Sequence, residues 1–448
     1  MGRWTMVGDA IVHRPSSIVH RSRMSATTTT TYAQTEVPAL VRRNTFLLAA
    51  AQCAGWLGLQ MQATLGSIAA FELTGNPGWA GIPATLFAVA SALAAPFAGR
   101  LTDRLGRKPV LAAGQAVAGL GSLVAGLALL WSLFGGFLLG VMLMGAGTGA
   151  LLLARSAAAD MYPAARRAGG MSLVIMGGAA GAIFGPVLLG LITGSGTTRL
   201  QITLPWLILP AFSVLAILAI AAIHPDPRRI AADLESYYPG ETSVSEAAMS
   251  AAPARPLGEI LRLQPVLVAV ASTALVQAGM VMLMVTASLS LKLHGHGDSV
   301  YGVMTGHFIG MLGLSLLIGR IADRLGRRAV IMGGALIYIS GALTAPLFES
   351  PLYNGASLFM VGLGWSLCYV AGNAVLADVS RPRERGRTMG ANDLLVGLTG
   401  AIASLMGGLL LGGAGYLTVG LVGLVLGVVP FLLALRLREP SPGRYEEA

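Results

Sequence analysis

The feature that most constrains this chain is a series of long apolar runs, separated by short stretches that hold most of its charges. A helix needs about 20 mostly apolar residues to cross the hydrocarbon core of a bilayer. Such runs cover residues 46–71, 79–99, 109–130, 133–158, 169–193, 202–223, 265–290, 299–319, 329–348, 352–377, 388–411 and 414–435. We therefore expect an all-α polytopic membrane protein with twelve transmembrane helices.

Composition excludes a soluble globular protein. Charged residues make up 11% of the chain, hydrophobic residues 54%, and the mean hydropathy is +0.71. A soluble domain would carry about a quarter charged residues. The two cysteines, Cys53 and Cys368, lie inside apolar runs, where they are expected to act as small buried hydrophobic residues and not as a disulfide or metal site.

The net charge of +10 raises the question of a nucleic-acid partner, but its distribution argues against one. Lys and Arg gather in short clusters between the apolar runs, as in polytopic proteins whose basic loops stay on the cytoplasmic side. If the amino terminus is cytoplasmic, only Arg199 and Lys292 of the 30 Lys and Arg residues fall outside. We expect a multi-pass protein of the cell membrane with both termini in the cytoplasm.

A charged turn appears twice, at residues 99–108 and again at residues 319–328. Both copies share their glycines, an Asp and most of their basic residues. A second correspondence at nearly the same offset relates Asp160, Arg166 and Arg167 to Asp378, Glu384 and Arg385. The chain is therefore expected to contain two parallel halves of six helices.

The repeat divides the chain into five parts. We expect a disordered basic cytoplasmic tail at 1–43, with Met24 as an alternative start, and a first half at 44–223. A cytoplasmic linker at 224–264, rich in Pro and acidic residues, precedes a second half at 265–437 and a short tail at 438–448. Within the linker, residues 228–237 are expected to form a short amphipathic helix on the membrane surface.

The pattern Gly-x-x-x-Asp-Arg-x-Gly-Arg-Lys/Arg, present once in each half, resembles the signature turn of the major facilitator superfamily of secondary transporters. The resemblance covers residues 44–437. It implies a twelve-helix fold and alternating access to a small-molecule site near the middle of the bilayer. It also implies a protein that is not an enzyme and needs no cofactor, and we expect it to act as a monomer in the lipid bilayer.

The chemistry of the turn suggests a latch between the halves. Gly106 and Gly326 permit a tight reversal of the backbone. A carboxylate near a helix amino terminus is favoured by about 0.3–2 kcal/mol, so Asp103 is expected to hold the start of helix eleven and Asp323 that of helix five. The alternative is that the basic residues only set the topology. The latch residues are Gly99, Asp103, Arg104, Gly106, Arg107, Gly319, Asp323, Arg324, Gly326 and Arg327.

The fifth span carries glycines at four-residue spacing and a proline, in a packing motif of Gly181, Gly185, Pro186 and Gly190 that follows Gly177. These residues let a neighbouring helix approach closely and favour a kink. They resemble the glycine-proline motif of the family's proton-coupled exporters, although Leu189 stands where a further glycine is usual. Residues 139–149 of the fourth span lack the intramembrane arginine of that pattern. Ordinary close packing of small residues is the alternative.

Ionisable groups within a span are functional candidates because a bilayer makes them costly. His307 is expected to carry protons, contact substrate or serve as a hydrogen-bonded structural histidine. Asp393 is expected to couple protons or, as the favoured alternative, to pair with arginines of the preceding loop. Arg155 can reach the interface or pair with Asp160.

Neutral polar and aromatic groups at mid-span complete the candidate substrate site. Gln60 on the first helix and Gln277 on the seventh occupy comparable places in the two halves, and in this family those helices line the cavity. The candidate substrate and coupling residues are Trp56, Gln60, Gln277, His307, Trp365, Tyr369, Asn373 and Asp393.

These features favour proton-coupled export of a small organic, amphipathic compound. The sequence has no Gly-x-x-x-x-Gly-Lys-Ser/Thr loop for nucleotide binding and no catalytic or metal-ligand cluster. Two alternatives stay open: an uptake carrier for a nutrient or vitamin, and a non-transporting sensor or scaffold of the same fold.

Overall fold

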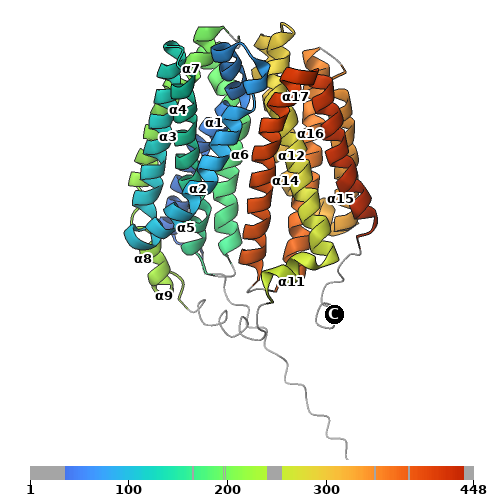
Figure 1. The fold of residues 1–448 in the computed structure, drawn as a ribbon. Coiled ribbons are helices and arrows are strands. Elements are labelled where there is room, and N and C mark those ends of the chain that lie inside the picture. The colour runs from blue at the N-terminus through green and yellow to red at the C-terminus, as the bar shows by residue number, and fades with distance from the viewer. Residues whose placement is uncertain are drawn as a thin grey trace, which may run out of the picture. The chain divides into compact units, whose positions relative to one another are not determined.

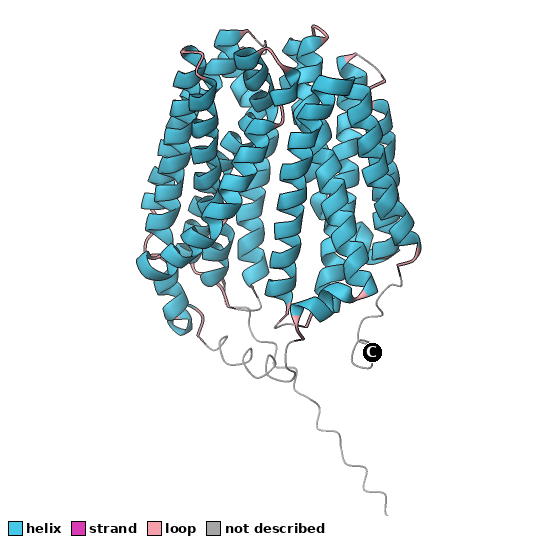
Figure 2. Cartoon of the chain, viewed as in Figure 1, coloured by secondary structure: helices cyan, strands magenta, loops and turns pink. Residues whose placement is uncertain are grey.

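The structure is a computed structural model that describes residues 36–163, 166–194, 196, 198–239, 255–347, 350–381 and 384–437. All regular elements in these ranges are helical (Figures 1 and 2). They belong to one compact unit, residues 38–448. The tail at 1–35, the linker residues 240–254 and the tail at 438–448 lie outside the described residues.

The first six spans follow the predicted order. They are α1 (Ala39–Thr74), α2 (Ile82–Leu105), α3 (Arg107–Leu130), α4 (Phe134–Leu151) continued by α5 (Ala154–Asp160), α6 (Arg167–Thr193) and α7 (Arg199–Ala221). A short 3-10 turn, η1 (Pro77–Trp79), precedes α2. After α7 come α8 (Pro227–Ala232) and α9 (Leu234–Tyr237), which are two short helices where one was expected, because the backbone leaves the helical region at Asp233.

The second set of spans begins after α11 (Leu257–Arg262). It comprises α12 (Gln264–Leu293), η2 (Gly297–Ser299), α13 (Val300–Phe308), η3 (Ile309–Gly313), α14 (Ser315–Leu325), α15 (Arg327–Thr344), α16 (Pro351–Val379) and α17 (Arg385–Leu435). α17 contains two spans, since Gly415 has φ 79° and ψ 175°, outside the helical region.

Length and composition support the span count. In the described residues, 8 helices are long and apolar enough to cross a membrane, or 9 if a bent pair counts as one span. The two spans within α17 add one, and α1 and α15, which are helical but fall short of this length and composition test, bring the number to the twelve expected. The prediction of a helical polytopic protein is confirmed.

The eighth span differs from the single helix expected at 299–319. It consists of α13, the π-helical turn η3 and α14, with a bend of 48°, and it continues to Leu325. Gly310 in η3 lies so close to the backbone carbonyl of Phe359 on α16 that a side chain would clash. An extra residue in the turn lets the span follow that contact.

The two sets of spans meet mainly at one end. We call the end that carries both charged turns the turn end; it lies at the bottom of Figure 1. At the opposite end, Thr85 Oγ1 donates to the carbonyl of Ala401 at 2.9 Å, and Ser404 Oγ donates to that of Gly81 at 2.9 Å. The Glu72–Lys292 ion pair links α1 to α12. These contacts hold the halves together far from the charged turns.

Candidate functional site

Both charged turns reverse the chain at a glycine. Gly106 has φ 97° and ψ 169°, and Gly326 has φ 88° and ψ 155°, so each separates two helices by a single residue. Positive φ at this position is a conformation that only glycine adopts freely. The structure therefore explains these two glycines. A Cβ at Gly99 or Gly319 would meet no atom within 4 Å, and packing in this conformation does not require either of them.

Each turn is tied to the fourth span of its own half by an arginine–aspartate pair that sequence reasoning missed. Arg107 Nε donates to Asp160 Oδ2 at 2.9 Å, and Arg327 Nε donates to Asp378 Oδ2 at 3.1 Å. Both aspartates occupy corresponding positions in the two repeats. Their matching positions next to a repeated arginine were the signal that could have predicted the pairs.

The two aspartates predicted to form the latch do not contact α17 or α6 through a hydrogen bond or ion pair in the described residues. Asp103 is exposed, and Asp323 pairs with Arg327 on its own side of the turn at 3.2 Å. Neither aspartate therefore links the two halves in this conformation.

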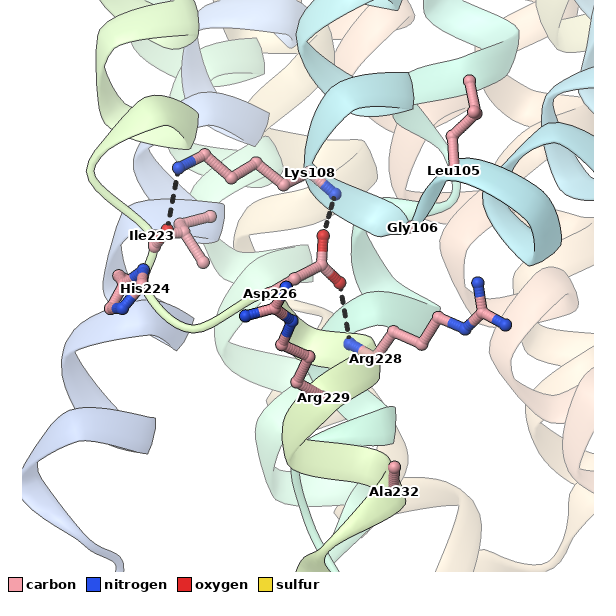
Figure 3. Close-up of a pocket in the computed structure, with 9 residues that line it drawn as sticks. All are labelled: Leu105, Gly106, Lys108, Ile223, His224, Asp226, Arg228, Arg229 and Ala232. Atoms are coloured by element: carbon pink, nitrogen blue, oxygen red, sulfur yellow. Dashed lines mark hydrogen bonds between the residues drawn. The ribbon is translucent and has the colours of Figure 1, made fainter.

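Asp226 joins the first turn to the segment after α7 (Figure 3). Its carboxylate accepts the backbone N–H of Lys108 at 2.9 Å and that of Arg228 at 2.8 Å, so it caps α3 and begins α8. Lys108 Nζ in turn donates to the carbonyl of Ile223 at 3.0 Å. A cavity of ≈ 610 Å³ lies beside these residues.

We expect Asp226→Ala to lower stability by about 1–2 kcal/mol, because it leaves helix amino-terminal N–H groups without their charged acceptor. Apparent unfolding temperature in detergent measures this effect. Asp233→Ala, which removes a nearby acid whose side chain caps neither helix, is the control and should change stability by less. Equal losses in the two variants would contradict the capping role.

Four of the candidate substrate residues form one group in the second half, the aromatic–amide cluster of Gln277, Trp365, Tyr369 and Asn373. Trp365 Nε1 donates to Gln277 Oε1 at 2.6 Å, and its ring stacks on Tyr369 with centroids 4.8 Å apart. Asn373 Nδ2 donates to the backbone carbonyl of Tyr369 at 2.9 Å. All four are half-buried, so α12 and α16 present a partly accessible surface of aromatic and amide groups.

Asp393 lies beside this cluster and reaches across to the first half. Its carboxylate is 3.8 Å from Arg155 Nη2 on α5 and lies next to the Tyr369 hydroxyl. The expected pairings of Asp393 with loop arginines and of Arg155 with Asp160 are therefore wrong. Asp160 pairs with Arg107 instead, which leaves Arg155 to project toward α17. At 46% and 45% exposure, the Arg155–Asp393 pair contributes at most about 1 kcal/mol, so its importance is its position between the halves.

The remaining candidate substrate residues, Trp56, Gln60 and His307, lie outside the aromatic–amide cluster. With the Gln52 amide oriented to suit its neighbours, its oxygen accepts from Trp56 Nε1 at 3.0 Å. Gln60 is 3% exposed on α1. His307 is fully buried, and its Nδ1 lies 2.7 Å from the backbone carbonyl of Leu358. No hydrogen bond or ion pair in the described residues joins any of the three to the aromatic–amide cluster.

The glycine motif of the fifth span packs two helix pairs. A side chain at Gly181 would clash with the carbonyl of Cys53 on α1, and one at Gly185 would press on Leu57. Gly190 faces the ring of Tyr301 on α13, across the boundary between the halves. Close packing thus accounts for these glycines, and Pro186 lies inside α6 without ending it.

Family comparison agrees with this geometry. The model of the Major Facilitator Superfamily matches residues 48–306 and 267–448. The chain belongs to this superfamily. The resemblance predicted from the charged turns is thereby confirmed, and the protein is a transporter-family membrane protein with no expected enzymatic activity.

Three relatives are similar to this chain. An MFS-type transporter of Bacillus subtilis strain 168, YdeG, is 30% identical over 400 residues, covering 87% of this chain and 90% of the relative. The riboflavin transporter RfnT of Brucella anthropi is 28% identical over 412 residues, covering 88% and 96%. The multidrug resistance protein MdtL of Escherichia coli is 34% identical over 93 residues, covering 21% and 23%.

A solved transporter structure shares the fold. A bacterial homologue of the human lysosomal transporter Spinster, in an inward-facing and unoccupied conformation, has a TM-score of 0.66 at 16% identity. The match covers 89% of this chain and 96% of that chain.

Proposed function

We propose that this protein exports a small amphipathic organic compound in exchange for protons, working as a monomer by alternating access between its halves. One observation carries the proposal: the Arg155–Asp393 pair bridges the two halves beside the aromatic–amide cluster. The charged turns face the cytoplasm in this proposal, as the distribution of Lys and Arg favours.

The aromatic–amide cluster suits a planar organic molecule. The stacked rings of Trp365 and Tyr369 offer apolar faces, and the amides of Gln277 and Asn373 offer donors and acceptors. Pockets for organic ligands commonly combine apolar surface with a few such polar groups. A phosphorylated or multiply charged solute would lack matching charges in this cluster.

Asp393 is the group that couples transport to protons in this proposal. When its carboxylate takes up a proton, it loses the charge that attracts Arg155, and the link between the halves weakens. When the proton leaves, the pair forms again. Protonation of one residue thus favours one arrangement of the two halves over another, which is the requirement for coupling.

Uptake of a vitamin-like compound is the second candidate. It is favoured by RfnT, the riboflavin transporter that matches 88% of this chain, whereas the match to MdtL is confined to 21%. Both candidates use the same cluster and the same coupling residue, and they differ in direction.

Vesicles of defined orientation test the proposal, with ethidium and riboflavin as probes. We expect inside-out vesicles with an acidic interior to accumulate ethidium, and we expect a protonophore to abolish the accumulation. Accumulation of riboflavin only in right-side-out vesicles would establish uptake and overturn export. Ethidium transport that is unchanged when the pH gradient is collapsed would overturn proton coupling.

The latch is part of the proposal and has its own prediction. Asp103→Asn removes the charge that would favour the start of α17, worth about 0.3–2 kcal/mol, or roughly a 2- to 30-fold shift between conformations. We expect slower transport with an unchanged unfolding temperature, because Asp103 is exposed in this conformation. Asp233→Asn, outside the turn, is the matched control. Full transport by the Asp103 variant would argue that the turns only set topology.

A further inference from the structure

Two arginines near the end of α2 have no acidic partner among the described residues. Arg100 and Arg104 are four residues apart and therefore share a helix face, where like charges repel. Arg228 adds a third positive charge, since its Nη1 donates to the backbone carbonyl of Arg104 at 3.4 Å. The nearby Asp226 carboxylate is engaged by backbone N–H groups, and Asp103 forms no ion pair with these arginines. Three cations are thus gathered here, and none of them forms an ion pair within the described residues.

An apolar groove begins beside Arg100 and Arg104. α4 packs extensively against both α2 and α3, whereas α2 and α3 barely touch, so a gap opens between them over α4. The groove has a volume of ≈ 560 Å³. Its apolar lining includes Phe97, Leu101, Val110, Ala113, Val117 and Ala146.

Both small and large residues line the groove. The small ones include Gly147 and Ala150 of α4 and Gly114 of α3. Large side chains at Phe97 and Leu101 are 68% and 42% exposed at its edge. Arg100 places its guanidinium carbon 6.0 Å from the ring centroid of Phe97, within the range of a cation–π contact. The groove is therefore lined mainly by apolar side chains and has cationic side chains at one end.

We propose that this groove binds an anionic glycerophospholipid, with an acyl chain between α2 and α3 and the phosphate at Arg100 and Arg104. Guanidinium groups recognise phosphate through paired hydrogen bonds, and basic clusters at a membrane surface attract anionic lipids. A free phosphate ester would leave the apolar groove unused. The ammonium group of a zwitterionic lipid would meet three cations, so the charges favour an anionic headgroup.

The test uses the purified full-length chain in detergent, titrated with dioleoyl phosphatidylglycerol or with dioleoyl phosphatidylcholine. A ligand of the folded state raises the apparent unfolding temperature by mass action. We expect phosphatidylglycerol to stabilise the unchanged protein at lower concentrations than phosphatidylcholine. In the double variant Arg100→Gln/Arg104→Gln, we expect phosphatidylglycerol to bind about 10- to 30-fold more weakly, which removes the preference.

Two further variants test separately whether the groove and the charges of the first turn contribute to lipid binding. Ala113→Phe fills the exposed groove without changing charge and should weaken phosphatidylglycerol binding. Arg320→Gln/Arg324→Gln removes the same charges from the second turn and should keep the preference. A double Arg100/Arg104 variant that still prefers phosphatidylglycerol would overturn the proposal. If glycerol 1-phosphate displaced phosphatidylglycerol as effectively as added lipid does, the site would bind only the headgroup. That result would also overturn the proposal.

Discussion

Replacing Asp393 by Asn is expected to reduce pH-gradient-driven transport to the level of protein-free vesicles. Asn keeps the shape of the side chain, but its amide neither gains nor loses a proton near neutral pH. Arg155 would then keep a polar neighbour at the 3.8 Å position, without the alternation of charge that couples the halves. The measurement is accumulation of the transported probe in oriented vesicles, with and without an imposed pH gradient.

The same variant should still exchange probe across the membrane. Exchange of labelled for unlabelled probe at equal pH needs only the alternating conformations and the aromatic–amide cluster. Asp298→Asn is the matched control, since it removes an exposed carboxylate of the second half that lies in η2, outside both charged turns. We expect it to keep gradient-driven transport. An Asp393→Asn protein that accumulates probe as fully as the unchanged protein would show that another group carries the proton.

The helices were predictable from sequence because their cause is local. A run of apolar residues long enough to span a bilayer forms a helix wherever it lies in the chain, although α1, α2 and α14 extend beyond the predicted ends and some spans are interrupted. The break in the eighth span was not predictable in this way. It depends on the contact between Gly310 and the backbone of Phe359, two residues that only the folded structure brings together.

The candidate site also has a part that was predictable from the sequence and a part that was not. Gln277, Trp365, Tyr369 and Asn373 were predicted as polar or aromatic groups at mid-span, and α12 and α16 place them together. The Arg155–Asp393 pair was missed because each residue has nearer charged neighbours in sequence. For His307 the sequence left three roles open, and the contact of its ring with the backbone carbonyl of Leu358 favours the hydrogen-bonded structural one.

A buried carboxylate at the start of α17 gives the largest expected effect on stability. Glu384 is fully buried, and its two oxygens accept from Arg255 Nε at 3.0 Å and from Arg255 Nη2 at 2.8 Å. It also accepts the backbone N–H of Arg381 at 3.0 Å. The pair joins the segment before α11 to the connection between α16 and α17. Sequence comparison had matched Glu384 to Arg166 of the first half, and gave no sign of this partner.

We expect Glu384→Ala to lower the free energy of unfolding by about 3 kcal/mol, the lower end for breaking a buried ion pair, because Arg255 is 22% exposed and keeps some solvent. Asp323→Asn is the control: its pair with Arg327 is an exposed i, i+4 contact, worth roughly 0.5 kcal/mol or less. Apparent unfolding temperatures of the purified variants in detergent measure both effects. Similar losses in the two variants would contradict a stabilising role for the Glu384–Arg255 pair.

The acid dependence of stability isolates the charge of Glu384. Hydrogen bonds from the Arg255 side chain, together with backbone N–H groups of Arg255 and Arg381, lower the pKa of Glu384 to about 2. A carboxyl whose folded pKa lies below its ordinary value of about 4.3 stabilises the fold above that value and loses the contribution as pH falls toward 2. We therefore expect the unchanged protein to exceed Glu384→Gln in unfolding temperature at pH 6, with the difference shrinking between pH 4.5 and pH 2. A constant difference across that range would place the effect of the substitution in packing, since packing does not titrate.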